Sequence, residues 1–253
     1  MKYFISEMKY KMNDILSSNI KIEVDSLKNV RENGFTAIEN FITVEECEKL
    51  RNEIDLMCEK DYVWRDKFNS DIRIHGVENV NKNFKNLFSA KILVNVFKKY
   101  INKNKIHQFI MTNRVTFTQD NLGSGGGWHR DTMNRRQLKF ILYLCDVDDK
   151  NGCFQYISKS HTVFNKLKYN RVLQKKFSEY RYSEKEIEDL KEKLNVEVLD
   201  FKGKAGMLII ADTSGLHRGK PILSGSRYAA TNYMSEVPFA PQLLKLIINE
   251  QNT

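Results

Sequence analysis

The hydrophobic pattern of this chain changes period near residue 108, and this change constrains the fold more than any other feature of the sequence. Before it, apolar residues recur at helical spacing over 44–59 and 89–102. After it, short alternating or wholly apolar runs predict strands. One predicted strand, 34–41, precedes the helices, and those after the change cover 109–112, 115–118, 137–144, 153–157, 196–201, 206–211 and 227–234. Helices followed by seven or eight short strands favour a mainly β fold, a β-sandwich or jelly-roll barrel with flanking helices.

Two helices are marked by capping boxes, in which a hydroxyl and a carboxylate satisfy the first free amides of a helix. Thr43 and Glu46 predict a helix from residue 44, and Ser183 and Glu186 predict one over 184–194. The second helix belongs to a charged insert, residues 163–195. Such an insert is either a lid over a site or a solvated decoration, and the sequence leaves both readings open.

The length and composition indicate a single domain with a sizeable core. Of the 253 residues, 41% are hydrophobic and 11% aromatic, which excludes a disordered chain. We expect a lead-in segment, a helical support, a jelly-roll core that contains the insert, and a C-terminal helix opened by Pro241. These parts cover residues 1–33, 34–107, 108–235 and 236–253.

Composition also bears on location and partners. No run approaches the roughly 18 apolar residues of a membrane span, and the N-terminus lacks the apolar stretch of a signal peptide. The four cysteines show no close-spaced framework, which indicates reduced thiols and a cytoplasmic protein. The net charge of +9 invites a nucleic-acid partner. Because the lysines are spread along the whole chain rather than clustered, we do not expect one.

A His-x-Asp pair carries the chemistry. In an extended segment residues i and i+2 point the same way, so His129 and Asp131 can reach one metal ion together. With a distant His217 they form the residue set of the 2-His-1-carboxylate facial triad, which binds non-haem Fe(II) and leaves coordination positions open. His-x-Asp alone arises often by chance. Here it follows the glycine-rich run 123–127, and His217 follows the apolar strand predicted at 206–211.

Arg227 stands ten residues after His217, at the start of a predicted strand. From there its guanidinium could face into the barrel. An arginine in that place could hold the carboxylate of a 2-oxo acid through two parallel hydrogen bonds.

Further motifs accompany these residues in a fixed order. Residues 34–50 combine a glycine, a short strand and a helix with early glutamates, and 144–152 lead to an Asn-Gly turn. Residues 153–161 end in Ser-His. This ordered set resembles the phytanoyl-CoA dioxygenase-type Fe(II)/2-oxoglutarate oxygenases. The pattern of that family has Pro-Gly where this chain has Ser158 and Lys159.

The resemblance covers roughly residues 34–235 and implies a double-stranded β-helix, the cupin-like form of the jelly roll. It implies Fe(II), 2-oxoglutarate and O₂ as cofactor and cosubstrates, with release of succinate and CO₂. It implies that Arg227 clamps 2-oxoglutarate and that His161 is structural. Related halogenases lack the carboxylate ligand, so Asp131 favours hydroxylation or another oxidation. The implied iron ligands are His129, Asp131 and His217.

Several secondary residues are candidate contacts. If Phe140 and the next-but-one residues pack against helices, Lys139 lines the barrel and could bind a cosubstrate or an anionic group; with the faces reversed it is solvent-exposed. Thr118 and Gln119, before the glycine run, are candidate cosubstrate contacts. Arg135 and Arg136, after the metal motif, are candidate substrate contacts.

The function that we predict is oxidation of a polar or anionic small molecule. Two alternatives stay open. The first is an oxygenase that acts on nucleic acid or protein, which the basic charge favours slightly. The second is a jelly roll that binds a ligand without turnover, and the combination of a metal triad with Arg227 argues against it. The sequence specifies neither the substrate nor the oligomeric state.

Overall fold

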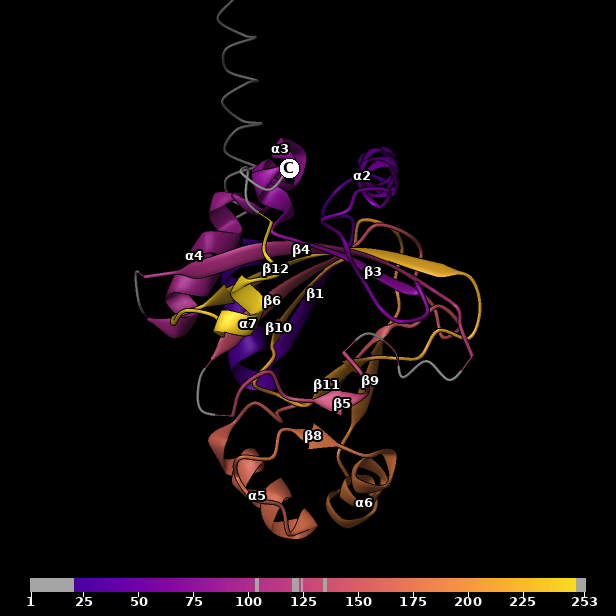
Figure 1. Ribbon diagram of the computed structural model, residues 1–253. Coiled ribbons are helices and arrows are strands. Elements are labelled where there is room, and N and C mark those ends of the chain that lie inside the picture. Colours follow the sequence, from indigo (N-terminus) through magenta and orange to yellow (C-terminus); the bar gives the residue numbers. More distant parts are fainter. Residues whose placement is uncertain (1–20, 103–104, 120–122, 124, 134–135, 249–253) are drawn as a thin grey trace, which may run out of the picture.

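The structure is a computed structural model, and it describes residues 21–102, 105–119, 123, 125–133 and 136–248. Two antiparallel sheets face each other, with helices on the outer side of each (Figure 1). The larger sheet has the strand order β1 (Phe35–Ile38), β10 (Leu208–Asp212), β6 (Gln137–Tyr143), β12 (Ser226–Ser235), β4 (His107–Thr116), β3 (Asp71–His75) and β2 (Trp64–Arg65). The smaller has the order β8 (Arg181–Tyr182), β5 (Trp128–His129), β11 (His217–Gly219), β7 (Phe154–Ile157) and β9 (Val198–Phe201). The predicted jelly-roll class is confirmed.

The helices gather in two groups (Figure 1). One group covers the outer face of the larger sheet, and the other lies beyond the smaller sheet, next to β8. The first group contains α2 (Val44–Met57), α3 (Lys82–Phe88) and α4 (Lys91–Ile101), and the second α5 (Val163–Leu173) and α6 (Glu184–Leu194). The short elements η1 (Val77–Asn79) and α7 (Pro241–Leu244) complete the set, together with helical residues 21–33.

The two faces of β6 divide the core. Phe140 and Leu142 belong to the apolar cluster under the helices, whereas Ile141 and Tyr143 belong to the cluster between the sheets. Burial of such side chains stabilises the fold by about 1.5–3 kcal/mol each. Lys139 therefore lies on the inner face and is buried, as the alternating pattern predicted for outward-packing apolar residues.

Both capping boxes are confirmed. Thr43 and Glu46 each accept the reciprocal backbone hydrogen bond at the start of α2, and Ser183 and Glu186 do so at α6. The predicted break between strands at 113–114 is wrong, because β4 continues through these residues and pairs with β12 along its whole length. The predicted C-terminal helix is much shorter than 236–253: among the described residues it covers only Pro241–Leu244.

Part of the predicted lead-in segment is helical. Residues 21–33 form a helix that buries Ser26 and Val30 against the core. The sequence of this segment is mostly polar and so shows little helical periodicity. A helix that buries only one narrow face needs few apolar residues.

The insert is a packed part of the fold. Its strand β8 pairs with β5, which places Tyr182 opposite Trp128 and Arg181 opposite His129. A third apolar cluster, which includes Trp128, Tyr182 and Leu190, joins α6 to the smaller sheet. This packing contradicts a solvated decoration, whereas a lid over the site stays a prediction.

All four cysteines are free thiols, and Cys47, Cys58 and Cys153 are buried. Within the parts of the chain that the structure describes, no helix combines the length and apolar character needed to cross a membrane.

Candidate metal and cosubstrate site

Three predicted ligands meet at the smaller sheet. His129 lies on β5, Asp131 follows it, and His217 on β11 is the direct pairing partner of His129. One ligand atom from each lies within 4.8 Å of the other two. Asp131 Oδ1 is 3.5 Å from His129 Nε2 and 3.8 Å from His217 Nε2. This spacing suits one metal ion between three ligand atoms.

Backbone carbonyls fix the tautomer of both imidazoles. Nδ1 of His129 lies 2.8 Å from the Gly127 oxygen, and Nδ1 of His217 lies 3.0 Å from the Gly215 oxygen. A carbonyl only accepts, so each Nδ1 carries the proton and donates. Each Nε2 therefore keeps its lone pair for a metal ion, which is the usual orientation of metal-binding histidines.

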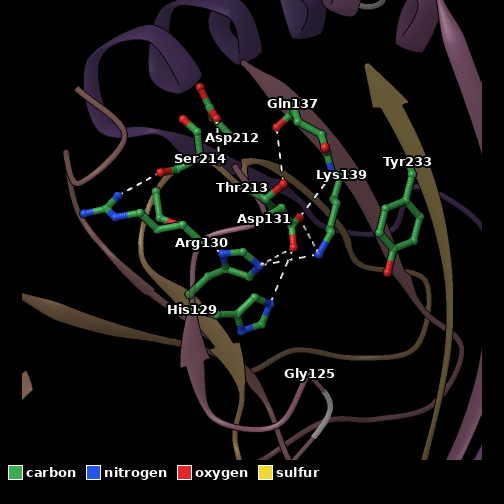
Figure 2. A network of polar contacts seen from close by, with 12 residues as sticks. Gly125, His129, Arg130, Asp131, Gln137, Lys139, Asp212, Thr213, Ser214 and Tyr233 are labelled. Carbon is green, nitrogen blue, oxygen red and sulfur yellow. Dashed lines mark hydrogen bonds and ion pairs between the residues drawn. The ribbon is translucent and has the colours of Figure 1, made fainter. Parts of the chain in front are cut away.

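Lys139 is the counter-charge of Asp131 (Figure 2). Its Nζ lies 2.7 Å from Asp131 Oδ2 and 3.4 Å from His217 Nε2, and Gln137 donates to the same carboxylate oxygen at 3.2 Å. The Asp131 side chain is only 18% exposed. Burial raises the pKa of this carboxyl, but Lys139 and the imidazoles outweigh it and hold the pKa well below its usual range.

The electrostatics of His217 favour the same ligand state. Burial, with His129 and Lys139 nearby, holds the pKa of His217 well below its usual value. A neutral imidazole beside an ionised carboxylate is the protonation state that metal binding requires.

Arg130, between the two first ligands, points away from them toward Ser214 (Figure 2). It is fully buried. Its Nη1 donates to the carbonyls of Ser160 and Ser214, each at 2.7 Å, and its Nε donates to the Tyr182 hydroxyl at 3.3 Å. This residue thus fixes the turn that carries the ligands.

A cavity of about 300 Å³ lies between the sheets, and the triad, Lys139 and Arg227 line it together. Arg227 on β12 is 5% exposed. Its guanidinium donates to the Gly152 carbonyl, while its Nε has no partner among the described residues. Burial of a cation without a carboxylate partner is costly, so this position fits an anionic ligand.

The sequence profile of the phytanoyl-CoA dioxygenase (PhyH) family matches residues 30–229. The chain belongs to this family. It is therefore an Fe(II)/2-oxoglutarate-dependent oxidoreductase, in agreement with the recognised motifs. No curated protein sequence matches the chain.

Solved structures of PhyH-like fold resemble this PhyH family member. The carbocyclase SnoK from nogalamycin biosynthesis has a TM-score of 0.64 at 14% identity, and the matched residues cover 84% of this chain and 83% of the SnoK chain. The epimerase SnoN, crystallised with Fe³⁺ and α-ketoglutarate, has a TM-score of 0.63 at 10% identity, with 85% and 84% covered. HygX from Streptomyces hygroscopicus, with nickel and 2-oxoglutarate bound, has a TM-score of 0.61 at 14% identity, with 85% and 88% covered.

Some predicted contacts lie outside the cavity of this PhyH protein. Thr118 and Gln119 follow the end of β4 and do not line it. Arg136 stacks over the Tyr100 ring at 5.0 Å and donates to the Tyr100 carbonyl at 3.2 Å, next to α4, so it does not line the cavity either. The prediction for Arg135 falls outside the described residues.

Sequence reasoning missed Arg73, Arg181 and Tyr233, which all line the cavity. Arg73 lies on β3, where the alternation of Ile72 and Ile74 with polar residues could have predicted a strand with Arg73 on its other face. Arg181 lies on the two-residue strand β8 of the insert, which is too short to carry a local signal. The alternation of 227–234 could have placed Tyr233 on the same face as Arg227, because the two are an even number of residues apart.

Proposed function

We propose that this protein is a non-haem Fe(II)/2-oxoglutarate-dependent dioxygenase that hydroxylates, or otherwise oxidises, a polar or anionic small molecule and releases succinate and CO₂. One observation carries the proposal. One ligand atom from each of two imidazoles and a carboxylate lies within 4.8 Å of the other two, and their cavity also contains a buried arginine that pairs with no carboxylate among the described residues.

The residues of the cavity have different roles in metal binding and cosubstrate binding. His129, Asp131 and His217 would hold the metal ion, and bound iron with 2-oxoglutarate supplies the activation of O₂. Arg227 would bind the distal carboxylate of 2-oxoglutarate through its planar guanidinium. Lys139, beside the triad, would contact the same cosubstrate. The protein contributes orientation and electrostatics.

Apolar side chains limit the water around the reacting groups. Ile141, Tyr143 and Phe154 line the same cavity as the triad. Inside such a wall, the interactions of Arg227 and Lys139 with an anion are stronger than in bulk water. The free thiols support a reducing compartment, and we propose that the enzyme works in the cytoplasm.

The test is anaerobic addition of Fe(II) and 2-oxoglutarate to the full chain, with the visible metal-to-ligand charge-transfer band as the readout. We expect the band in the native protein and in His107→Ala, because His107 lies on β4 outside the cavity. His217→Ala should lose it. A native protein that retains no iron and shows no band would refute the proposal.

A further inference from the structure

The cavity holds more positive charge than its cosubstrate needs. Five cationic side chains line it, against the single carboxylate of Asp131. Lys139 is paired with Asp131, and Arg130 is engaged by backbone carbonyls. A dianionic cosubstrate would offset a divalent metal ion, so the loaded cavity would keep an excess of positive charge. That excess favours an anion as the second organic ligand.

Arg181 lines both this cavity and a second one beside it, and no carboxylate among the described residues forms an ion pair with it. Its Nη1 donates to the carbonyls of Gly125 and Gly126, at 3.0 and 3.1 Å. In the described part of the chain it makes no ion pair with a carboxylate. A guanidinium has five N–H groups, so several remain for a ligand. The two backbone hydrogen bonds hold the group in place, which lowers the entropy lost on binding.

Two neighbouring cavities share part of their lining. A second cavity of about 550 Å³ lies next to the first and shares Arg73, Gly125 and Arg181 with it. Trp64 and Phe68 line this outer cavity and are exposed. The two shared arginines thus stand between the metal ligands and an outer surface that offers aromatic rings.

We propose that the substrate is an organic anion, a phosphate or a carboxylate, whose charged group binds between Arg73 and Arg181 at the junction of the two cavities. This inference rests on the proposed function. The carbon to be oxidised reaches inward toward the triad, and the remaining apolar or planar part extends over Trp64 and Phe68.

The two arginines contribute differently. Arg73 is paired with Asp71, to which its Nε donates at 3.0 Å, so much of its charge is offset. It also stacks over Trp64, with 5.1 Å from the guanidinium carbon to the ring centroid. Arg181 therefore supplies most of the attraction for the anion, and Arg73 supplies a planar wall.

The probe for this inference is phenyl phosphate, titrated by calorimetry into the full chain loaded with Fe(II) and 2-oxoglutarate without O₂. Loading occupies Arg227, so the probe reports the junction. Benzoate and benzyl alcohol are titrated in the same way. We expect at least one of the two anions to bind at least about tenfold more tightly than the neutral alcohol, and the tighter anion identifies the charged group.

Two variants test whether the anion binds at Arg181. Arg181→Gln should weaken anion binding at least about tenfold and leave benzyl alcohol unchanged. Arg171→Gln, an exposed arginine on α5 of the same insert, should bind the anion like the native protein. Equal binding of anion and alcohol, or equal binding by the two variants, overturns the inference. If Arg181→Gln fails to fold, Arg181→Met takes its place, since it also removes the charge, and an unchanged anion affinity in it overturns the inference.

The charge-transfer band separates the two possible failures. If the proposed function is wrong, the native protein shows no band with Fe(II) and 2-oxoglutarate, whatever the probe does. If only the inference about the substrate is wrong, the band forms normally in the native protein and in Arg181→Gln, while the anions gain nothing over benzyl alcohol.

Discussion

Arg227 is the single residue on which cosubstrate binding should depend most. It is buried, its Nε has no partner among the described residues, and it shares the cavity of the triad. Arg227→Gln should weaken 2-oxoglutarate binding by about 10–100-fold, because a charge-assisted pair out of water is lost. The affinity of Arg227→Lys for 2-oxoglutarate should lie between those of the native protein and Arg227→Gln, since an ammonium keeps the charge but lacks the planar shape of a guanidinium.

The measurement is a titration of 2-oxoglutarate into the Fe(II)-loaded protein, followed by the charge-transfer band. Iron retention in Arg227→Gln should equal that of the native protein, because this side chain is not among the three metal ligands. A native affinity for 2-oxoglutarate in Arg227→Gln would show that another group holds its distal carboxylate.

Lys139 presents the opposite case, a cation close to the ligand atoms themselves. Its ammonium lies 2.7 Å from Asp131 Oδ2 and therefore opposes a second cation at the same carboxylate. Lys139→Met should bind a divalent metal ion at least about tenfold more tightly in the absence of 2-oxoglutarate. Calorimetry with Mn(II) measures this directly. Weaker metal binding would instead show that Lys139 holds Asp131 in its ligand position.

Gly125 is required next to His129. A Cβ at Gly125 would lie 2.5 Å from His129 Cε1, and its φ is +90°. Gly225 has a similar φ of +71°, but nothing lies within 4 Å of a Cβ there. Alanine at either position costs about 1–2 kcal/mol of stability through backbone strain. Only Gly125→Ala should also weaken metal binding, by at least about tenfold. Equal metal affinities in the two variants would contradict this.

At the scale of elements, what could be predicted depends on how local the signal is. The start of α2 and both ends of α6 follow from capping boxes and helical spacing, which involve residues within a few positions of each other. The alternation of β6 predicts that Lys139 shares a face with Ile141 and Tyr143, but which face is inward becomes known only from the packing of the helices. By contrast, β5, β8 and β11 are two or three residues long, and they exist only because they pair with each other across long stretches of sequence.

The same reasoning explains the candidate site. His129 and Asp131 are two residues apart, so their shared direction is a local property. Arg73 and Arg181 reach the cavity only through sheet pairing, β3 with β4 and β8 with β5. Such pairings carry no signal in the neighbouring sequence. Thr118 and Gln119 show the converse, because their closeness in sequence to the glycine run does not bring them into the lining of the cavity.

Arg130 joins several elements, and its removal should therefore affect the whole turn. It links β5 to Tyr182 of the insert and to the carbonyls of Ser160 and Ser214. Arg130→Met leaves these buried acceptors without a donor and should lower the free energy of unfolding by about 2–4 kcal/mol. Urea unfolding measures it. Arg171→Met, an exposed position, should change by less than about 0.5 kcal/mol. A similar change in both variants would contradict the role of Arg130.

For the whole molecule, acid stability should depend on His75 of β3. This side chain is 5% exposed, and burial, with a smaller effect from Arg73, lowers its pKa to about 4. In the unfolded chain it takes up a proton near the ordinary value of 6.5. The unfolded state therefore binds more protons between these two values. The contribution of the neutral His75 to the free energy of unfolding is fully present above pH 6.5 and is lost as the pH falls toward 4.

A His75→Phe variant isolates this contribution, because phenylalanine keeps the ring that stacks on Phe109, with 6.4 Å between the native ring centroids. Urea unfolding of both proteins at about pH 7 and about pH 4.5 gives four free energies. Carboxylates that titrate in acid are common to both proteins and cancel. The native protein should lose about 2–3 kcal/mol more than the variant between the two conditions. Equal losses would mean that His75 takes up its proton without unfolding, and that the acid sensitivity of the molecule lies in its carboxylates.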